Sequence, residues 1–208
     1  MSTNIEYGRV IATPLDTDKI KTELKIIDTN ITTNKQNKVY DSRTSNPQPP
    51  SLTLHFDGKF LLLRVIREDE ILRFSYKAVS GRPIEGKFDY SKERQAIKGK
   101  GPIPEGEYHI NPQEIQYTDD RTTYDKLKGV FNRGTFKGGT TAWGIGRVWI
   151  YPQQVVVDGV IRDHFSIHGG TEPGSAGCID LTSNDKDFFD KLIQYRGNIT
   201  KIPLTVKY

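Results

Sequence analysis

Cysteine is scarce in this sequence, which has a single one, Cys178, among 208 residues. One cysteine excludes an internal disulfide and a zinc site built from several thiolates. Three roles stay open for it: a buried inert thiol, a reactive thiol, or a bridge to another chain. The residues around Cys178 therefore carry most of the functional information.

Long apolar runs and strong charge of one sign are also missing. No run approaches the 18 apolar residues that indicate a transmembrane helix. Met1–Tyr7 has neither a basic nor an apolar leader region, so we expect no secretory signal peptide. The 30 Lys and Arg against 26 Asp and Glu leave a net charge of +4 with no basic cluster. Nucleic acid is therefore not an expected partner.

The first fifty residues differ in composition from the rest. They are rich in Asn, Thr and Asp, contain only two aromatics, and end in the proline-rich stretch Pro47–Pro50. This pattern predicts an extended polar arm over 1–50 and a catalytic domain over 51–208. An apolar stretch near 20–27 leaves an added edge strand as the alternative for part of the arm.

The sequence from residue 51 onward has the pattern of β-structure. Leu52–Phe56 alternates between apolar and polar residues, and the turn Asp57-Gly58 joins it to a second apolar run over 59–66. Further strands are expected at 71–79, 106–110, 143–151, 154–157, 160–167 and 199–206. Pro203 predicts that the last of these is an edge strand. Long loops are expected at 82–101 and 112–141.

One helix is predicted near the C-terminal side, with Thr182 or Ser183 as its N-cap and Gly197 after its end. Its apolar face would comprise Phe188, Phe189, Leu192 and Ile193. The expected fold is therefore mainly β, a β-sandwich-like domain with one helix on the C-terminal side and long loops.

The chemistry centres on His168, which ends a strand, and on Cys178, which follows ten residues later after a glycine-rich loop. A free thiol has a pKa of about 8.5, so a nucleophilic cysteine needs a neighbouring base, and histidine is the usual one. Backbone amides near Gly177 and Cys178 are candidates for an oxyanion hole. The alternative is a structural cysteine and a core histidine. The four glycines and the serine between them are poor core material, so catalysis is favoured.

A metal or cofactor site is not indicated. His164 and His168 fall on one face of the expected strand 160–167, but no carboxylate cluster accompanies them. His164 is instead a candidate to support His168.

These residues also carry a family resemblance. His168-Gly169 followed by Ser175-Ala176-Gly177-Cys178 resembles the active-site signature of L,D-transpeptidases of the YkuD type. Ala176 replaces a usual His, Asp180 replaces a usual Arg, and the His-to-Cys spacing is shorter. These departures resemble the branch of L,D-transpeptidase effectors delivered by type VI secretion. The resemblance extends to 78–81, 98–108 and 143–147, and spans about residues 52–206.

The resemblance implies a β-sandwich-like enzyme that acts on peptidoglycan stem peptides. Cys178 would attack the L-centre carbonyl of the third stem residue and release the terminal D-Ala. Water would then complete an L,D-carboxypeptidase reaction, or an amine a transpeptidation. His168 would be the base, and the Gly169 carbonyl would orient its imidazole.

Other residues receive weaker assignments. Ser175 would either hold the loop or reach the substrate. Arg147 and Arg162 are candidates to bind stem carboxylates, because guanidinium binds carboxylate in a bidentate manner. A solvated strand face is the alternative for Arg162. Trp143 would either form a wall of the groove or fill the core.

Three kinds of protein fit these features. The first is an interbacterial toxin, secreted without a signal peptide, that acts in the target cell periplasm and is inhibited by a cognate immunity protein. Its arm over 1–50 would then bind a component of the secretion system. The second is a cell-wall maintenance enzyme with the same chemistry, which would need an export signal. The third is a non-catalytic wall-binding module, which the intact His168 and Cys178 disfavour.

Overall fold

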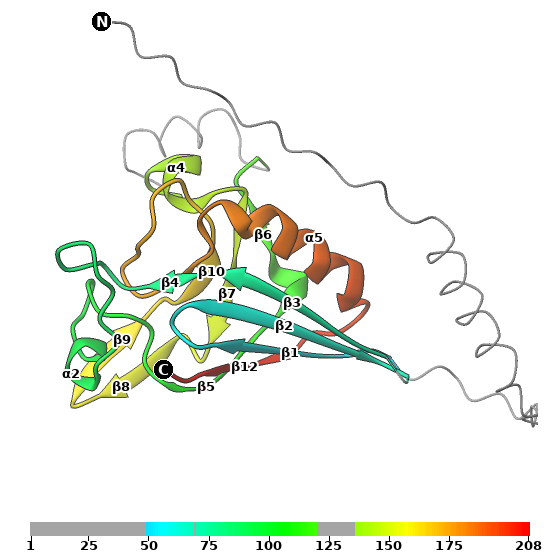
Figure 1. Cartoon of the computed structure of the whole chain (residues 1–208), viewed down its shortest axis with the longest axis horizontal. Coiled ribbons are helices and arrows are strands. Elements are labelled where there is room, and N and C mark those ends of the chain that lie inside the picture. The colour runs from blue at the N-terminus through cyan, green and yellow to red at the C-terminus, as the bar shows by residue number, and fades with distance from the viewer. Residues whose placement is uncertain (1–48, 69, 120–135) are drawn as a thin grey trace, which may run out of the picture. The chain divides into compact units, whose positions relative to one another are not determined.

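The computed structural model describes residues 49–68, 70–119 and 136–208 (Figure 1). The predicted arm over 1–50 lies almost wholly outside these residues, as does much of the expected loop over 112–141. The described chain is mainly β with one long helix and long loops, which confirms the predicted fold class. No helix in these ranges is long and apolar enough to cross a membrane.

The first three strands form a meander whose alternation was visible in the sequence. β1 (Ser51–Phe56), β2 (Phe60–Arg67) and β3 (Glu70–Lys77) pair antiparallel, with Leu54 opposite Leu63. The β1–β2 turn is stabilised by Asp57, whose Oδ1 accepts hydrogen bonds from the amides of residues 59 and 60. The buried faces of β1 and β2 contribute six fully or nearly buried apolar side chains to the core.

These strands continue into a sheet of ten strands in the order β3-β2-β1-β12-β5-β7-β10-β11-β4, with β6 paired to β7. The remaining members are β4 (Val79–Ser80), β5 (Gly106–Ile110), β6 (Gln116–Tyr117), β7 (Gly146–Tyr151), β10 (Ser166–His168), β11 (Ile179–Asp180) and β12 (Ile202–Val206). A parallel β10–β11 pair lies between β7 and β4. His168 ends β10 and Cys178 precedes β11, so the two candidate residues lie on neighbouring strands.

The prediction that β12 is an edge strand is wrong. β12 lies between β1, to which it is parallel, and β5, to which it is antiparallel. Pro203 is tolerated because it pairs only with His109 of β5, whereas the register with β1 begins at Leu204. The missing N–H of proline thus falls where β12 has a single partner.

The expected strand 160–167 is interrupted. β8 (Gln154–Val157) and β9 (Val160–Asp163) form a separate two-stranded sheet. His164 follows with a φ of +60°, a left-handed conformation, before β10 begins at Ser166. His164 and His168 therefore do not share one face of a continuous strand, and the expected alternation fails at this bend.

The long helix α5 (Asp185–Arg196) begins after a 3₁₀ turn over Thr182–Asn184. Neither Thr182 nor Ser183 caps it, and the N-cap residue Asn184 makes no side-chain capping bond. Gly197 ends the helix with a positive φ, as predicted.

The buried face of α5 is formed by Phe188, Phe189 and Leu192, each 0% exposed, whereas Ile193, which was also predicted for this face, is 40% exposed. Phe188 packs edge-on against Tyr76 of β3 with ring centroids 5.5 Å apart. Full burial of each such side chain stabilises the fold by about 1.5–3 kcal/mol. This packing fixes α5, and with it the segment that follows Cys178.

Two short helices were not anticipated. α2 (Lys92–Gln95) lies within the loop expected at 82–101, and Ser91 caps it by accepting a hydrogen bond from the amide of Arg94. α4 (Gly139–Trp143) occupies the start of the strand expected at 143–151. Strand β7 consequently starts at Gly146 rather than at Trp143.

Candidate active site

His168 is the last residue of β10 and is 4% exposed. Its Nδ1 lies 2.6 Å from the carbonyl oxygen of Gly169, which makes Nδ1–H the donor of this hydrogen bond. The other ring nitrogen, Nε2, is then the one available to a thiol. The Gly169 carbonyl therefore lies where it can orient the imidazole, the role that the family resemblance implied for it.

Cys178 immediately precedes β11, and this strand places it beside His168. Ile167 of β10 pairs with Ile179 of β11 in a parallel register, so the loop over 169–178 must return the chain to the same end of the sheet. The thiol and the imidazole are close enough for each to shift the pKa of the other. The parallel pairing of β10 and β11, with the glycine-rich loop between them, is thus sufficient to bring the two residues together.

The electrostatics of the pair favour charge separation. Burial acts most strongly on each group and opposes its charged form. The mutual hydrogen bond and charge interaction outweigh burial, so the pKa of Cys178 is lowered and the pKa of His168 is raised. Both directions favour a thiolate facing an imidazolium. Such a thiolate is the nucleophilic form of cysteine.

Ser166 is a functional candidate that the sequence analysis did not identify. Its hydroxyl is fully buried and donates a hydrogen bond to Cys178 Sγ at 3.3 Å. This contact also lowers the pKa of Cys178. Ser166 and His168 are two residues apart on β10 and so share one face of the strand. This alternation along the strand was the sequence signal that could have identified Ser166.

The loop between the two residues is held by its own side chains. The Ser175 hydroxyl donates to the carbonyl of Cys178 at 2.7 Å and accepts from the amide of Gly177 at 3.2 Å. Asp180 accepts from the amides of Gly174 and Thr182. Ser175 therefore holds the loop in this structure. The Gly177 amide would have to leave Ser175 to act as an oxyanion donor.

Two glycines at the site are required by close contacts. A Cβ atom on Gly169 would lie 2.2 Å from Asp185 Oδ2, a carboxylate that also accepts from the amide of Ile145 at 2.7 Å. A Cβ atom on Gly177 would lie 2.8 Å from a guanidinium nitrogen of Arg162, at a φ of +130°. Asp185 at the start of α5 thus supports the His168–Gly169 backbone from behind.

Arg147 and Trp143 lie on the His168 side of the site. Arg147 of β7 is directly opposite His168 in the sheet register, and its pKa is lowered by burial. Its guanidinium lies 4.1 Å from the ring centre of Trp149 and 4.8 Å from that of Trp143, and its Nε donates to Gln116 Oε1. The Trp143 ring is 4.9 Å from the ring of His168. Trp143 therefore forms a wall beside the imidazole.

Arg162 departs from both readings of the sequence. It is 1% exposed, so it does not lie on a solvated strand face. Its guanidinium donates to the carbonyls of Gln95, Gly101 and Pro102. Burial lowers its pKa. Because these carbonyls occupy its donors, Arg162 is placed to fix the 95–102 segment beside the Cys178 loop rather than to bind a free carboxylate.

His164 contributes its backbone rather than its ring. Its carbonyl oxygen lies 3.8 Å from Cys178 Sγ, whereas its side chain is 73% exposed and pairs with Asp163. A role as side-chain partner of His168 is therefore wrong.

Cys178 opens into a cavity of about 200 Å³ that is lined by Lys98, Gly99, Arg162, Asp163, His164, Ala176 and Cys178. Lys98 Nζ and Asp163 Oδ2 lie 3.2 Å apart at this cavity, from segments distant in sequence. A separate and larger cavity does not include Cys178. Within the described ranges, no group of three or more His, Cys, Asp or Glu side chains could hold a metal ion.

A protein family and a solved structure are similar to this chain. Residues 76–203 match the Tlde1 domain, a stretch that contains every site residue named above. A structure of Bd1075 from Bdellovibrio bacteriovorus has a TM-score of 0.42 and 16% sequence identity. That match covers 74% of this chain and 46% of the other, so this chain spans less than half of that protein's length. No curated protein matches the sequence.

Proposed function

We propose that this chain, which belongs to the Tlde1 domain family of type VI secretion L,D-transpeptidase effectors, is a cysteine enzyme that acts on tetrapeptide stems of peptidoglycan. The observation that supports the chemistry is the buried pair of Cys178 and His168, with the thiol pKa lowered and the imidazole pKa raised. A buried structural thiol without a partner would have a raised pKa instead.

The reaction begins when the Cys178 thiolate attacks the carbonyl of the L-centre of the third stem residue. The imidazolium of His168 protonates the departing amine of the terminal D-Ala, so the peptide bond breaks and a thioester remains. His168, now neutral, takes a proton from water or from an incoming amine. Water releases a tripeptide, whereas the amine of a free D-amino acid replaces the terminal residue.

The size and position of the small cavity suit this step. A space of about 200 Å³ next to Cys178 matches one small terminal residue rather than a whole stem. Ser166, by donating to the sulfur, stabilises the thiolate before attack. Trp143 and Gly169 hold the imidazole on its other sides.

The experiment is digestion of purified disaccharide-tetrapeptide with the full chain, with and without a free D-amino acid, followed by mass spectrometry. Loss of the mass of D-Ala indicates carboxypeptidase activity, and a mass corresponding to the added amino acid indicates exchange. Cys178→Ala should abolish both products and retain the melting temperature. Ser75→Ala, which removes an exposed hydroxyl that lines neither cavity, is the matched control. Turnover by Cys178→Ala near that of the wild type would refute the mechanism.

We further propose that the enzyme acts in the periplasm of a target cell. Expression in a Gram-negative host, with and without an added export signal, tests this. Growth should stop only when the protein is exported, and Cys178→Ala with the same signal should be harmless. Equal toxicity without export would argue for a target other than the cell wall.

A toxin of this kind requires an immunity protein in the cell that produces it, and we propose that this partner covers the Cys178 cavity. Saturation with the cognate inhibitor should slow alkylation of Cys178 by iodoacetamide. An unchanged alkylation rate in the saturated complex would place the inhibitory contact elsewhere.

A further inference from the structure

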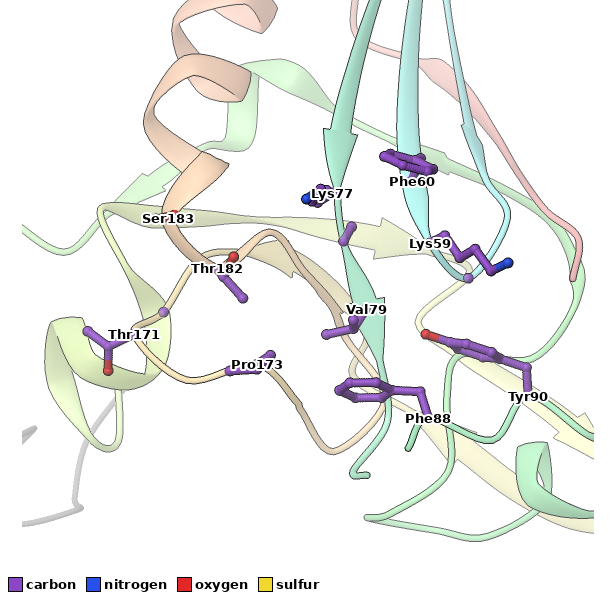
Figure 2. A pocket seen from close by; sticks show the side chains of 13 residues that line it. Lys59, Phe60, Lys77, Val79, Phe88, Tyr90, Thr171, Pro173, Thr182 and Ser183 are labelled. Carbon is purple, nitrogen blue, oxygen red and sulfur yellow. The ribbon is translucent and has the colours of Figure 1, made fainter. Parts of the chain in front are cut away.

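A second cavity, of about 910 Å³, shares no lining residue with the small cavity at Cys178. Its volume is within the range of about 300–1,000 Å³ that is typical of small-molecule sites. Figure 2 shows Thr171, Pro173 and Thr182 on one side, and Phe60, Phe88 and Tyr90 on the other. None of the residues assigned to the reaction above lines it.

The aromatic wall is partly open to solvent, and two of its three rings stack on neighbouring rings. Phe60 is 41% exposed, and the rings of Phe88 and Tyr90 stack at 6.5 Å with an interplanar angle of 17°. Tyr90 stacks in turn on Tyr208 at 4.4 Å, and its hydroxyl accepts a hydrogen bond from the amide of Ser80. Phe60 is exposed while Phe88 and Tyr90 are half-buried, so the three rings present apolar surface to the cavity.

The opposite wall is formed by the first part of the loop over 169–178 and by the residues that follow β11. Gly170 follows the His168–Gly169 dipeptide directly, and its amide donates to the carbonyl of Thr182. The amide of Thr171 donates to the carbonyl of Thr141. These backbone bonds hold three hydroxyl-bearing residues at the cavity, Thr171, Thr182 and Ser183.

Two cations complete the lining. Lys59 lies in the β1–β2 turn and Lys77 ends β3, and both are exposed. Lys77 pairs with Phe60 of β2, the residue after Lys59. Apolar rings, hydroxyls and ammonium groups together complement a ligand with apolar C–H faces, hydroxyl edges and carboxylates. An amino sugar that carries an acidic peptide has this combination.

We propose that this second cavity binds the amino-sugar end of a muropeptide, the disaccharide with the first acidic residues of its stem, while Cys178 acts at the distal end of a stem. The inference rests on the proposed function for its choice of substrate. The sugar faces stack on Phe60 and Phe88, and the lysines pair with the stem carboxylates. The shared loop connects the glycan site to the reacting pair.

The test compares kcat/KM for the disaccharide-tetrapeptide and for the free tetrapeptide of the same sequence. The wild type should prefer the disaccharide form. Phe60→Ala and Phe88→Ala should each reduce that preference by about two- to tenfold, the effect of losing one aromatic contact. Their rates on the free tetrapeptide should not change. Ile71→Ala is the matched control, because Ile71 is 43% exposed on the same β2–β3 pair but at its other end.

A binding measurement separates this proposal from the proposed reaction. ¹⁵N-labelled Cys178→Ala protein is titrated with the peptide-free disaccharide of N-acetylglucosamine and N-acetylmuramic acid. The amides of Thr171, Thr182 and Phe60 should shift, and Phe88→Ala should weaken the binding. Turnover of neither substrate would refute the reaction but not this site. Equal wild-type kcat/KM for both substrates, or no shift of these amides at millimolar disaccharide, would overturn it.

Discussion

Removing the Ser166 hydroxyl is expected to make Cys178 a poorer nucleophile without unfolding the protein. The hydroxyl is fully buried and donates to Cys178 Sγ at 3.3 Å. A hydrogen bond to a charged acceptor contributes about 1.5–3 kcal/mol. Sulfur is a weak acceptor, so the lower end of that range applies. At about 1.4 kcal/mol per factor of ten, Ser166→Ala should shift the thiol–thiolate equilibrium about tenfold toward the thiol.

The assay is the rate of iodoacetamide alkylation as a function of pH, because only the thiolate reacts. Loss of the hydrogen bond raises the pKa of Cys178, so the Ser166→Ala profile should move to higher pH. At a fixed pH on the rising part of the wild-type profile, the rate should fall about tenfold, as derived above.

Two variants separate this effect from a general loss of packing. Ser166→Thr keeps the hydroxyl and should restore much of the rate. Ser175→Ala removes a hydroxyl that bonds to the loop backbone and not to the sulfur, so it should change stability more than the pH profile. A Ser166→Ala profile that coincides with the wild-type profile would refute the reasoning.

Three further predictions follow from the same geometry. His168→Ala should lower kcat/KM by about 10²–10⁴, the usual worth of a general base, whereas His164→Ala, with a side chain 73% exposed, should lower it far less; the reverse order in steady-state assays would refute the assignment. The pH profile of kcat/KM should be bell-shaped, because activity appears as Cys178 ionises at its lowered pKa and is lost as His168 deprotonates at its raised pKa; a single ascending limb would show that the pair does not work as an ion pair. Arg162→Lys should lower the free energy of unfolding by about 3 kcal/mol, because lysine cannot bond to all three carbonyls and those left without a donor stay buried. Denaturant unfolding compared with wild type measures this, and an unchanged midpoint would mean that these bonds contribute nothing to stability.

Local sequence patterns were sufficient to predict that Cys178 and His168 lie together and that the first hairpin forms. The loop from Gly169 to Cys178 is short and rich in glycine, so few arrangements other than a tight return are open to it. Asp57-Gly58 likewise specifies its turn, because the Asp57 carboxylate bonds to the next two available amides. In both cases the interacting groups are close in sequence, and residue type alone constrains the geometry.

Contacts between distant segments decided the rest. From the local sequence Arg162 is a polar strand residue, and only the packing of the 95–102 segment against it supplies the carbonyls that it binds. Pro203 reads as an edge residue until β1, about 150 residues earlier in the chain, pairs beside β12 from Leu204 onward. Asp185 reads as a helix-start carboxylate until Gly144 and Gly169 are packed against it. The sequence alone identified the candidate pair, because Cys178 and His168 are close in sequence. Tertiary structure decided what surrounds the pair, because burial and strand order depend on segments that no local pattern brings together.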